Sequence, residues 1–357
     1  MASRASLGIS SIEVEVIPGL EEFAIEEIEQ RMSATANPRR LQKEGRLALR
    51  SPPDLQLFNR LKSVVAVHLV RLFDVPRPQA FLGHENLERL MDFAQSVIAG
   101  LPKGTFTTFY VSAAGSDSAI FARVKSEIAA RLGLTCNDRE GDLLLTFRRP
   151  PDGGSGWEVL VRTSPRPLAA RAWRTCDFPG ALNASVAYAM VTLTKPRVDD
   201  VFVNLCCGSG TLMVERLAFG LAESVTGYDV DQRALDCARL NLTASGSASE
   251  ARLLLHDARG LPLPAGSVNA LVADLPYAML VGSARENQRL YPDLLKEAAR
   301  IASVGARFVL ITTARHLMTE VLDDFASRWE RDRVIPIKIP YHRGYITPSI
   351  YVLSRKS

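Results

Sequence analysis

The chain has 357 residues, 47% hydrophobic and 23% charged, a balance typical of folded globular proteins and too apolar for a wholly disordered one. Its length favours two or three domains. No apolar stretch approaches the length of a membrane span, and the N-terminus lacks the apolar core of a secretory signal. We therefore expect a cytoplasmic protein. The net charge of +4 is only weak support for an anionic partner.

The five cysteines are odd in number and scattered, and none stands in a CxxC pair. This pattern disfavours a disulfide framework or a zinc site. The adjacent pair Cys206 and Cys207 could not bind one metal without severe backbone distortion. We expect reduced thiols and no metal.

The first half of the chain predicts two small α+β modules. In the first, residues 10–78, we expect strands at 11–17, 45–51 and 65–75 and helices at 19–32 and 53–64. In the second, residues 79–163, we expect helices at 85–100 and 118–133 and strands at 105–113, 142–149 and 157–163. Residues 164–182 are rich in Pro and Arg and are interpreted as a linker.

Residues 183–357 predict a doubly wound α/β domain, because short, almost continuously apolar strands alternate with helices. The expected strands are 200–206, 224–230, 251–258, 268–275 and 306–313, with helices at 210–220, 231–246, 287–302 and 315–329. The last two strands, 333–340 and 348–354, have no helix between them. The mostly parallel sheet should therefore end in an antiparallel pair.

Glycines and acids follow the strands of this predicted domain. Gly208 and Gly210 follow the first strand, where open parallel sheets bind ligands. Asp229, Asp257 and Asp274 end the next three strands. Taken singly, each acid is more simply explained as a helix cap or turn former. Together they suit a ligand with a ribose, an adenine and a cationic group, a description that S-adenosylmethionine fits. Neither GxGxxG nor GxxxxGK[ST] is present.

The segments 204–215 (NLCCGSGTLMVE), 227–231 (GYDVD), 256–259 (HDAR) and 274–279 (DLPYAM) resemble, in this order, the motifs of Rossmann-like methyltransferases. The last is similar to the [DN]-P-P-[YF] signature of amino-methyltransferases. Segment 18–28 resembles the start of an N-terminal ferredoxin-like domain, which precedes a THUMP domain in RNA-modification enzymes. Over nearly the whole chain the best match is the THUMP-containing tRNA guanine-N2-methyltransferases. Two departures are Asn204, where the family usually has Asp, and Leu275, where Pro is commoner.

The resemblance implies S-adenosylmethionine-dependent methylation of a guanosine N2 amine in tRNA, in the acceptor-stem region at position 6. It implies a ferredoxin-like domain at 10–78, a THUMP domain at 79–163 and the methyltransferase domain at 183–357. The expected partner is tRNA, with no membrane, metal or obligate protein partner. The implied cofactor residues are Asn204, Cys206, Gly208, Ser209, Gly210, Thr211, Asp229, Val230, Asp257, Ala258 and Asp274.

A base amine is a poor nucleophile because its lone pair is delocalised into the ring. We expect the Asp274 side chain and the Leu275 carbonyl to accept the amine hydrogens, Pro276 to fix the turn and Tyr277 to stack on the base. For RNA binding we expect the basic stretch 148–174, in which Asp152 and Glu158 are the only acids, to supply Arg148, Arg149, Arg166, Arg171 and Arg174. A solvated rim is an equal alternative for that cluster. There are two alternatives. The protein could methylate ribosomal RNA, or it could bind RNA with an inactive methyltransferase domain.

Overall fold

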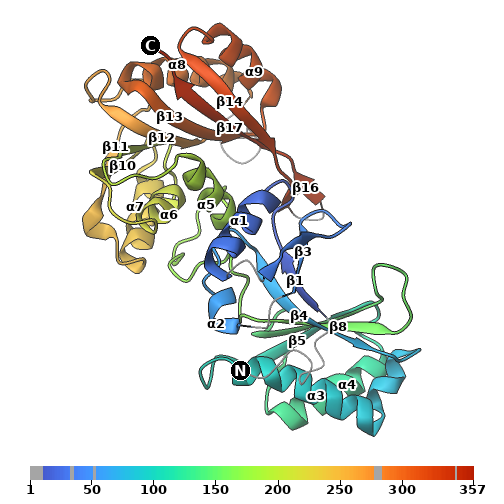
Figure 1. Ribbon diagram of the computed structural model, residues 1–357. Coiled ribbons are helices and arrows are strands. Elements are labelled where there is room, and N and C mark those ends of the chain that lie inside the picture. Colours follow the sequence, from blue (N-terminus) through green and yellow to red (C-terminus); the bar gives the residue numbers. More distant parts are fainter. Residues whose placement is uncertain (1–10, 33–35, 51–53, 277–283, 342–343) are drawn as a thin grey trace. The chain divides into compact units, whose positions relative to one another are not determined.

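The structure is a computed structural model, and it describes residues 11–32, 36–50, 54–276, 284–341 and 344–357 (Figure 1). The chain divides into two compact units. Residues up to 16 and 21–169 form the first unit, and residues 17–20 and 170–357 form the second. The expected linker is therefore divided, because its part from residue 170 onward packs within the second unit.

The first unit is built on one eight-stranded sheet with the order β2-β3-β1-β4-β8-β7-β5-β6. Strands β4 and β8 pair antiparallel, with His68 opposite Arg162, and so join the strands of the two predicted modules into a continuous sheet. The strands are β1 (Ser11–Glu15), β2 (Arg39–Arg40), β3 (Arg46–Leu49), β4 (Ala66–Phe73), β5 (Thr108–Ala113), β6 (Thr135–Cys136), β7 (Leu143–Arg148) and β8 (Trp157–Arg162).

The helices of the first unit bury their apolar sides, as the amphipathic patterns predicted. Edge-to-face contacts join Phe81, Phe121 and Phe147, which come from a 3-10 turn, a helix and a strand. The expected helix at 53–64 is reduced to a single turn, capped by the Asp54 side chain at the Leu57 amide. The helices are α1 (Glu21–Met32), α2 (Leu55–Phe58), α3 (His84–Ala99) and α4 (Ala119–Leu132), with the 3-10 helix η2 (Pro78–Leu82).

The second unit contains a seven-stranded sheet with the order β11-β10-β9-β12-β13-β17-β14. The first five strands are parallel, and β17 pairs antiparallel with both β13 and β14. The doubly wound fold with an antiparallel end is confirmed. A small hairpin between β14 and β17 was not expected. The strands are β9 (Val201–Leu205), β10 (Ser224–Asp229), β11 (Ala251–Leu255), β12 (Val268–Asp274), β13 (Ala302–Thr312), β14 (Trp329–Pro336), β15 (Ile339–Tyr341), β16 (Gly344–Ile346) and β17 (Ser349–Arg355).

Helices cover both faces of this second sheet (Figure 1). On one face, α8 and α9 pack on a core that includes Leu205, Leu271 and Phe308. Helices α5, α6 and α7 cover the other face. Open sheets of this kind bind ligands at the carboxyl ends of their parallel strands. In the part of the chain that the structure describes, no helix has an apolar run long enough to cross a bilayer. The helices are α5 (Ala184–Leu193), α6 (Thr211–Leu217), α7 (Gln232–Ala244), α8 (Ala284–Ile301) and α9 (Arg315–Asp324), with the 3-10 helix η3 (Ala248–Glu250).

Candidate active site

The loop after β9 has an unusual backbone. Cys206, Gly208 and Gly210 have positive φ values of 58°, 51° and 78°. For Cys206 this conformation is strained, and such strain is concentrated at functional sites. A side chain at Gly210 would press on Ala238 of α7, only 3.1 Å from an ideal Cβ, whereas one at Gly208 would meet no atom within 4 Å. The loop is therefore packed on one side and open at Gly208.

Asp229 at the end of β10 is held by this loop. Its Oδ2 accepts a hydrogen bond from the Gly208 amide at 2.8 Å, and its Oδ1 accepts one from the Asp231 amide at 3.0 Å. A carboxylate has about four acceptor positions, so two remain for other donors such as ribose hydroxyls. The neighbouring Val230 is 69% exposed, an apolar surface beside the carboxylate.

The three predicted acids lie near one another. Burial, followed by the charges of Asp229, Asp274 and Asp257, raises the pKa of the Cys206 thiol to about 12. Cys206 is thus a neutral thiol among three carboxylates. Asp257 is not free, because both its oxygens bind the Arg259 guanidinium, whose hydrogen bonds hold the pKa of Asp257 below its usual value. An adenine edge at Asp257 would share that carboxylate with Arg259.

The turn after β12 is fixed from several sides. The Leu275 amide donates to the Ile311 carbonyl at 3.1 Å, and the Leu275 side chain is buried in the core of the sheet. The Pro276 carbonyl accepts hydrogen bonds from Asn287 Nδ2 at 2.8 Å and from the Tyr291 hydroxyl at 3.0 Å. Tyr277, expected to stack on the base, lies outside the described residues.

Asn287 and Tyr291 were not anticipated as parts of the site. They lie four residues apart on α8, hence on one helix face, and both face the turn. The Tyr291 hydroxyl also lies 2.7 Å from Thr312 Oγ1. Burial, then the charge of Asp274, raises the pKa of Tyr291 to about 12, so Tyr291 stays a neutral donor. The sequence could have indicated them by the i, i+4 spacing of two polar residues in an amphipathic helix.

Asn204 lies in the middle of the sheet, opposite Gly227 of β10 and Val272 of β12. Its side chain is fully buried, and neither of its amide atoms has a hydrogen-bond partner among the described residues. Leaving buried polar atoms unpaired costs about 1–3 kcal/mol, which a polar ligand could recover. The remaining predicted cofactor residues, Ser209, Thr211 and Ala258, are buried around the loop.

Residues 171–343, just under half of the chain, match the UPF0020 family model, described as an RMKL-like methyltransferase domain. Among curated proteins, tRNA (guanine(6)-N(2))-methyltransferase THUMP3 of Mus musculus is 28% identical over 193 residues, covering 50% of this chain and 37% of the relative. The tRNA (guanine(6)-N2)-methyltransferase of Thermus thermophilus is 29% identical over 197 residues, covering 55% and 56%. This chain thus spans little more than a third of the mouse relative.

Solved structures extend the likeness to the fold of nearly the whole chain. TrmN from Thermus thermophilus superposes with a TM-score of 0.70 at 21% identity, covering 97% of this chain and 99% of that one. SMU.472, a putative methyltransferase complexed with SAH, gives 0.65 at 15% identity, covering 96% and 97%. Residues 171–343 of the second unit are thus similar to the RMKL-like methyltransferase domain, and this unit is called the methyltransferase domain below. The family resemblance of its motifs is confirmed, whereas the THUMP assignment stays a prediction.

A disulfide in the methyltransferase domain corrects the expectation of reduced thiols. Cys176 and Cys237 are bonded, with Cα atoms 5.4 Å apart, in the range that a disulfide requires. The two cysteines are separated by 61 residues, but the segment before α5 packs on α7. There Asn241 of α7 binds both the Cys176 amide and the Cys176 carbonyl. The two cysteines are therefore close in the fold although they are far apart in the sequence.

The arginines expected to bind RNA are in different surroundings. Arg171 is 7% exposed and paired with Glu215, so its guanidinium is not available to a phosphate in this structure. Arg174 donates to the Leu182 carbonyl and to Thr211 Oγ1. Both tie the predicted linker to the methyltransferase domain. Asp152 and Glu158 are the only acids within 148–174, but carboxylates from distant segments also reach these arginines.

The other three arginines belong to the first unit. Arg148 is paired with Glu13 at 2.6 Å and with Glu158 at 2.8 Å. Arg149 donates to the Gly156 and Pro76 carbonyls and lies 4.8 Å from the centre of the Trp157 ring. Arg166 is exposed, and within the described residues its guanidinium has no hydrogen-bond or ion-pair partner. Of the five, Arg166 is the one whose charge is free.

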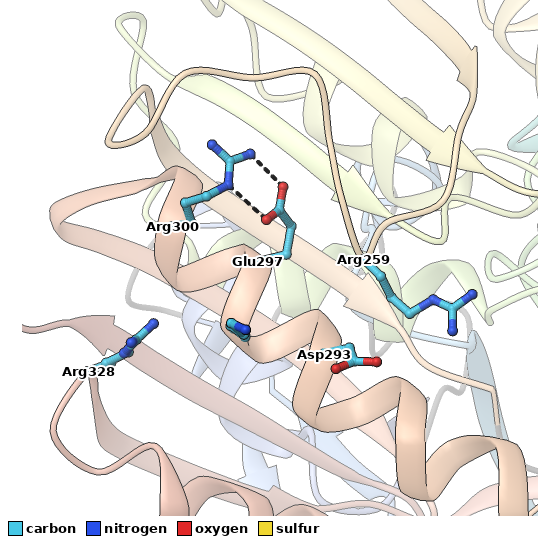
Figure 2. A pocket seen from close by; sticks show the side chains of 6 residues that line it. Arg259, Asp293, Glu297, Arg300 and Arg328 are labelled. Carbon is cyan, nitrogen blue, oxygen red and sulfur yellow. Dashed lines mark hydrogen bonds and ion pairs between the residues drawn. The ribbon is translucent and has the colours of Figure 1, made fainter.

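The methyltransferase domain also has a charged hollow of about 560 Å³ beside α8 (Figure 2). Its lining contains none of the predicted site residues. Glu297 pairs there with Arg300, as the figure draws, and also accepts the Leu261 amide at 2.7 Å. The Arg300 hydrogen bonds lower the pKa of Glu297. Glu297 and Arg300 neutralise each other and Arg259 is paired with Asp257. Because this hollow contains none of the predicted site residues, the sheet edge remains the better candidate for the active site.

Proposed function

We propose that this protein transfers a methyl group to the exocyclic N2 amine of a guanosine in tRNA, in the acceptor-stem region at position 6. The observation that carries the proposal is the turn Asp274-Leu275-Pro276 at the carboxyl end of β12, beside the glycine loop of the methyltransferase domain. The names of the relatives in mouse and in Thermus thermophilus support the tRNA and the guanine-N2 position.

We propose S-adenosylmethionine as the cofactor, which would supply an electrophilic methyl group on its sulfonium. The residues present fit it. The Asp229 carboxylate has acceptor positions left for ribose hydroxyls, and Val230 offers an apolar surface for adenine. The space around a side chain position at Gly208 is open, and the Asn204 amide, which has no partner among the described residues, offers a donor and an acceptor.

At the base, we assign acceptor roles to the Asp274 carboxylate and the Leu275 carbonyl. Two acceptors for the amine hydrogens would orient the nitrogen lone pair towards the methyl group. The Pro276 carbonyl is already held by Asn287 and Tyr291, so the turn would present its acceptors with little motion. Tyr277 would stack on the base once the base has flipped out of its RNA helix.

The direct test is transfer of labelled methyl groups from S-adenosylmethionine to purified tRNA, followed by nucleoside mass spectrometry mapped to position. We expect N2-methylguanosine at position 6. Ribosomal RNA in a parallel reaction tests the alternative substrate, since preferential labelling there would replace tRNA in the proposal. RNA binding without any labelling would support the inactive RNA-binding alternative.

The cytoplasmic location expected from the sequence also remains a proposal. The Cys176–Cys237 bridge weighs against it, because disulfides are rare in reducing compartments. Measuring the free thiols of protein alkylated during cell lysis tests it: five free thiols would agree with the cytoplasm, and three would not.

A further inference from the structure

A groove of about 1010 Å³ lies on the methyltransferase domain, next to the turn that follows β12. It is formed by the start of α8, the junction of β13 with α9, and the ends of β14 and β17 that lie nearest to them. Its lining includes Asn287, Gln288, Arg315, Thr319, Val334 and Tyr351. Because Asn287 binds the Pro276 carbonyl, the groove adjoins the proposed base site.

Asn287 brings an unpaired acceptor to this groove. The residue is 1% exposed, and its Nδ2 donates to the Pro276 carbonyl at 2.8 Å, which fixes the orientation of the amide. Its Oδ1 is buried and has no partner in the described part of the chain. An unpaired buried acceptor costs about 1–3 kcal/mol, so a ligand that donates a hydrogen bond there would be favoured.

Arg315 brings a positive charge. It is exposed at the first residue of α9, and its guanidinium has no carboxylate partner among the described residues. The next residue, His316, lies against Glu320 instead. The Arg315 carbonyl accepts from Thr319 Oγ1 and from the Tyr351 hydroxyl, which fix the backbone that carries it. An anion would find an available guanidinium here.

Apolar surface completes the groove. Val334, 42% exposed on β14, and Pro336 line it together with the buried ring of Tyr351. A single groove thus combines an apolar wall, a buried hydrogen-bond acceptor and an unpaired guanidinium. A ribonucleotide has the matching parts, namely a base face, amino or hydroxyl donors and a phosphate.

We propose that this groove holds the nucleotide adjoining the methylated guanosine in the substrate RNA, with Arg315 on its phosphate and Asn287 Oδ1 accepting from its base or ribose. The proposal rests on the proposed function and extends it to a second subsite. Arg315 would contribute to RNA affinity and to the choice of sequence beside the target, and would not touch the reacting amine.

The test compares Arg315→Gln with a matched control, Arg252→Gln. Arg252 is exposed on β11, the edge strand at the opposite end of the sheet from β14, and its loss changes the net charge equally. We expect Arg315→Gln to raise the KM for tRNA about fivefold, to leave kcat within twofold, and to lower the salt slope of binding by about 0.7–0.9. Arg252→Gln should match wild type, and calorimetry with S-adenosylmethionine should give equal affinities for all three proteins.

A substrate change identifies the contact. In RNA carrying an uncharged methylphosphonate on one side of the mapped target, the KM values of wild type and Arg315→Gln should differ by less than twofold. Equal KM values and salt slopes for Arg315→Gln and wild type would overturn the subsite. So would an Arg315 effect that persists with a methylphosphonate on either side. If wild type methylates no RNA, the proposed function itself fails, which is a separate result.

Discussion

Two of the charged clusters in this molecule have opposite arrangements. On the sheet of the first unit, the buried Glu13 lies between Arg46 and Arg148, at 3.2 Å and 2.6 Å, and Arg148 also binds Glu158. At the carboxyl edge of the second sheet, Asp229, Asp257 and Asp274 surround one thiol. Asp257 is paired with Arg259, but Asp229 is held by backbone amides.

The two clusters differ in role: the charges of the first join strands, whereas those of the second can contact a ligand. In the first region each cation has a carboxylate from another strand, so the network is internally satisfied and removing one partner would leave a buried charge. In the second region, backbone donors orient a carboxylate without neutralising it, at the edge where parallel sheets bind ligands. A carboxylate in such a cluster keeps acceptor positions for a ligand when backbone amides rather than a cation hold it, as at Asp229.

The strongest test of this contrast is Asp274→Ala. We expect methyl transfer to fall at least about 100-fold, because one oriented acceptor at the reacting amine is lost, while cofactor affinity stays within a few-fold. Single-turnover rates on tRNA measure the effect. Asp293→Ala, an exposed carboxylate on α8, is the control and should keep normal rates. A near-normal rate for Asp274→Ala would place catalysis elsewhere.

Asp229→Ala tests whether the amide-held carboxylate binds the cofactor. Each charge-assisted hydrogen bond is worth about 1.5–3 kcal/mol before compensation, so we expect S-adenosylmethionine affinity to fall roughly 10- to 100-fold by calorimetry. Asp236→Ala, on the exposed face of α7, is the control. Unchanged affinity with a lower melting temperature would make Asp229 only a brace for the Gly208 amide.

Local pattern predicted the carboxyl ends of β9, β10, β12 and β13 to within one residue, because an apolar run followed by a glycine turn or an acid is contiguous in the chain. It placed Asp257 at the end of a strand wrongly, since β11 already ends at Leu255. Partners that are distant in sequence were not predicted. Glu215, which pairs with Arg171 across 44 positions, and the Cys176–Cys237 bridge both depend on how segments pack. Asn287 and Tyr291 fall between these cases, since helical spacing placed them on one face but did not show what that face meets.

His68 tests the claim that the first region is structural. Burial, then the charges of Arg46, Arg162 and Arg148, lowers its pKa from 6.5 to about 3. Between those values the unfolded chain binds a proton that the folded chain does not, so the free energy of unfolding falls as pH falls from about 6.5. One proton corresponds to at most about 1.4 kcal/mol per pH unit.

His68→Gln removes this titration. We expect its melting temperature to decline less steeply than that of wild type between pH 6.5 and 4.5. His316→Gln, at an exposed histidine, should follow wild type. Parallel curves for wild type and His68→Gln would mean that the folded protein protonates His68 readily, and that the network around Glu13 is open to water.

The smallest expected effect concerns the arginines of the first unit, where paired and free cations stand close in sequence. Arg166 is exposed and its guanidinium is unpaired among the described residues, so its contribution to RNA binding would be a phosphate contact. We expect Arg166→Gln to weaken tRNA binding two- to fivefold and to lower the salt slope by about 0.7–0.9. Cofactor affinity should not change, because the first unit contains none of the proposed cofactor residues.

Arg149→Gln is the matched comparison, since it removes the same charge from a guanidinium that is already engaged. That guanidinium binds two carbonyls and lies over the Trp157 ring, so its loss should lower the melting temperature and leave the salt slope near that of wild type. Filter-binding titrations between 50 and about 200 mM salt separate the two variants. The opposite result, a lower salt slope for Arg149→Gln and an unchanged one for Arg166→Gln, would contradict this. It would mean that an arginine paired within the protein can still bind RNA, so that pairing does not distinguish structural from RNA-binding arginines in this unit.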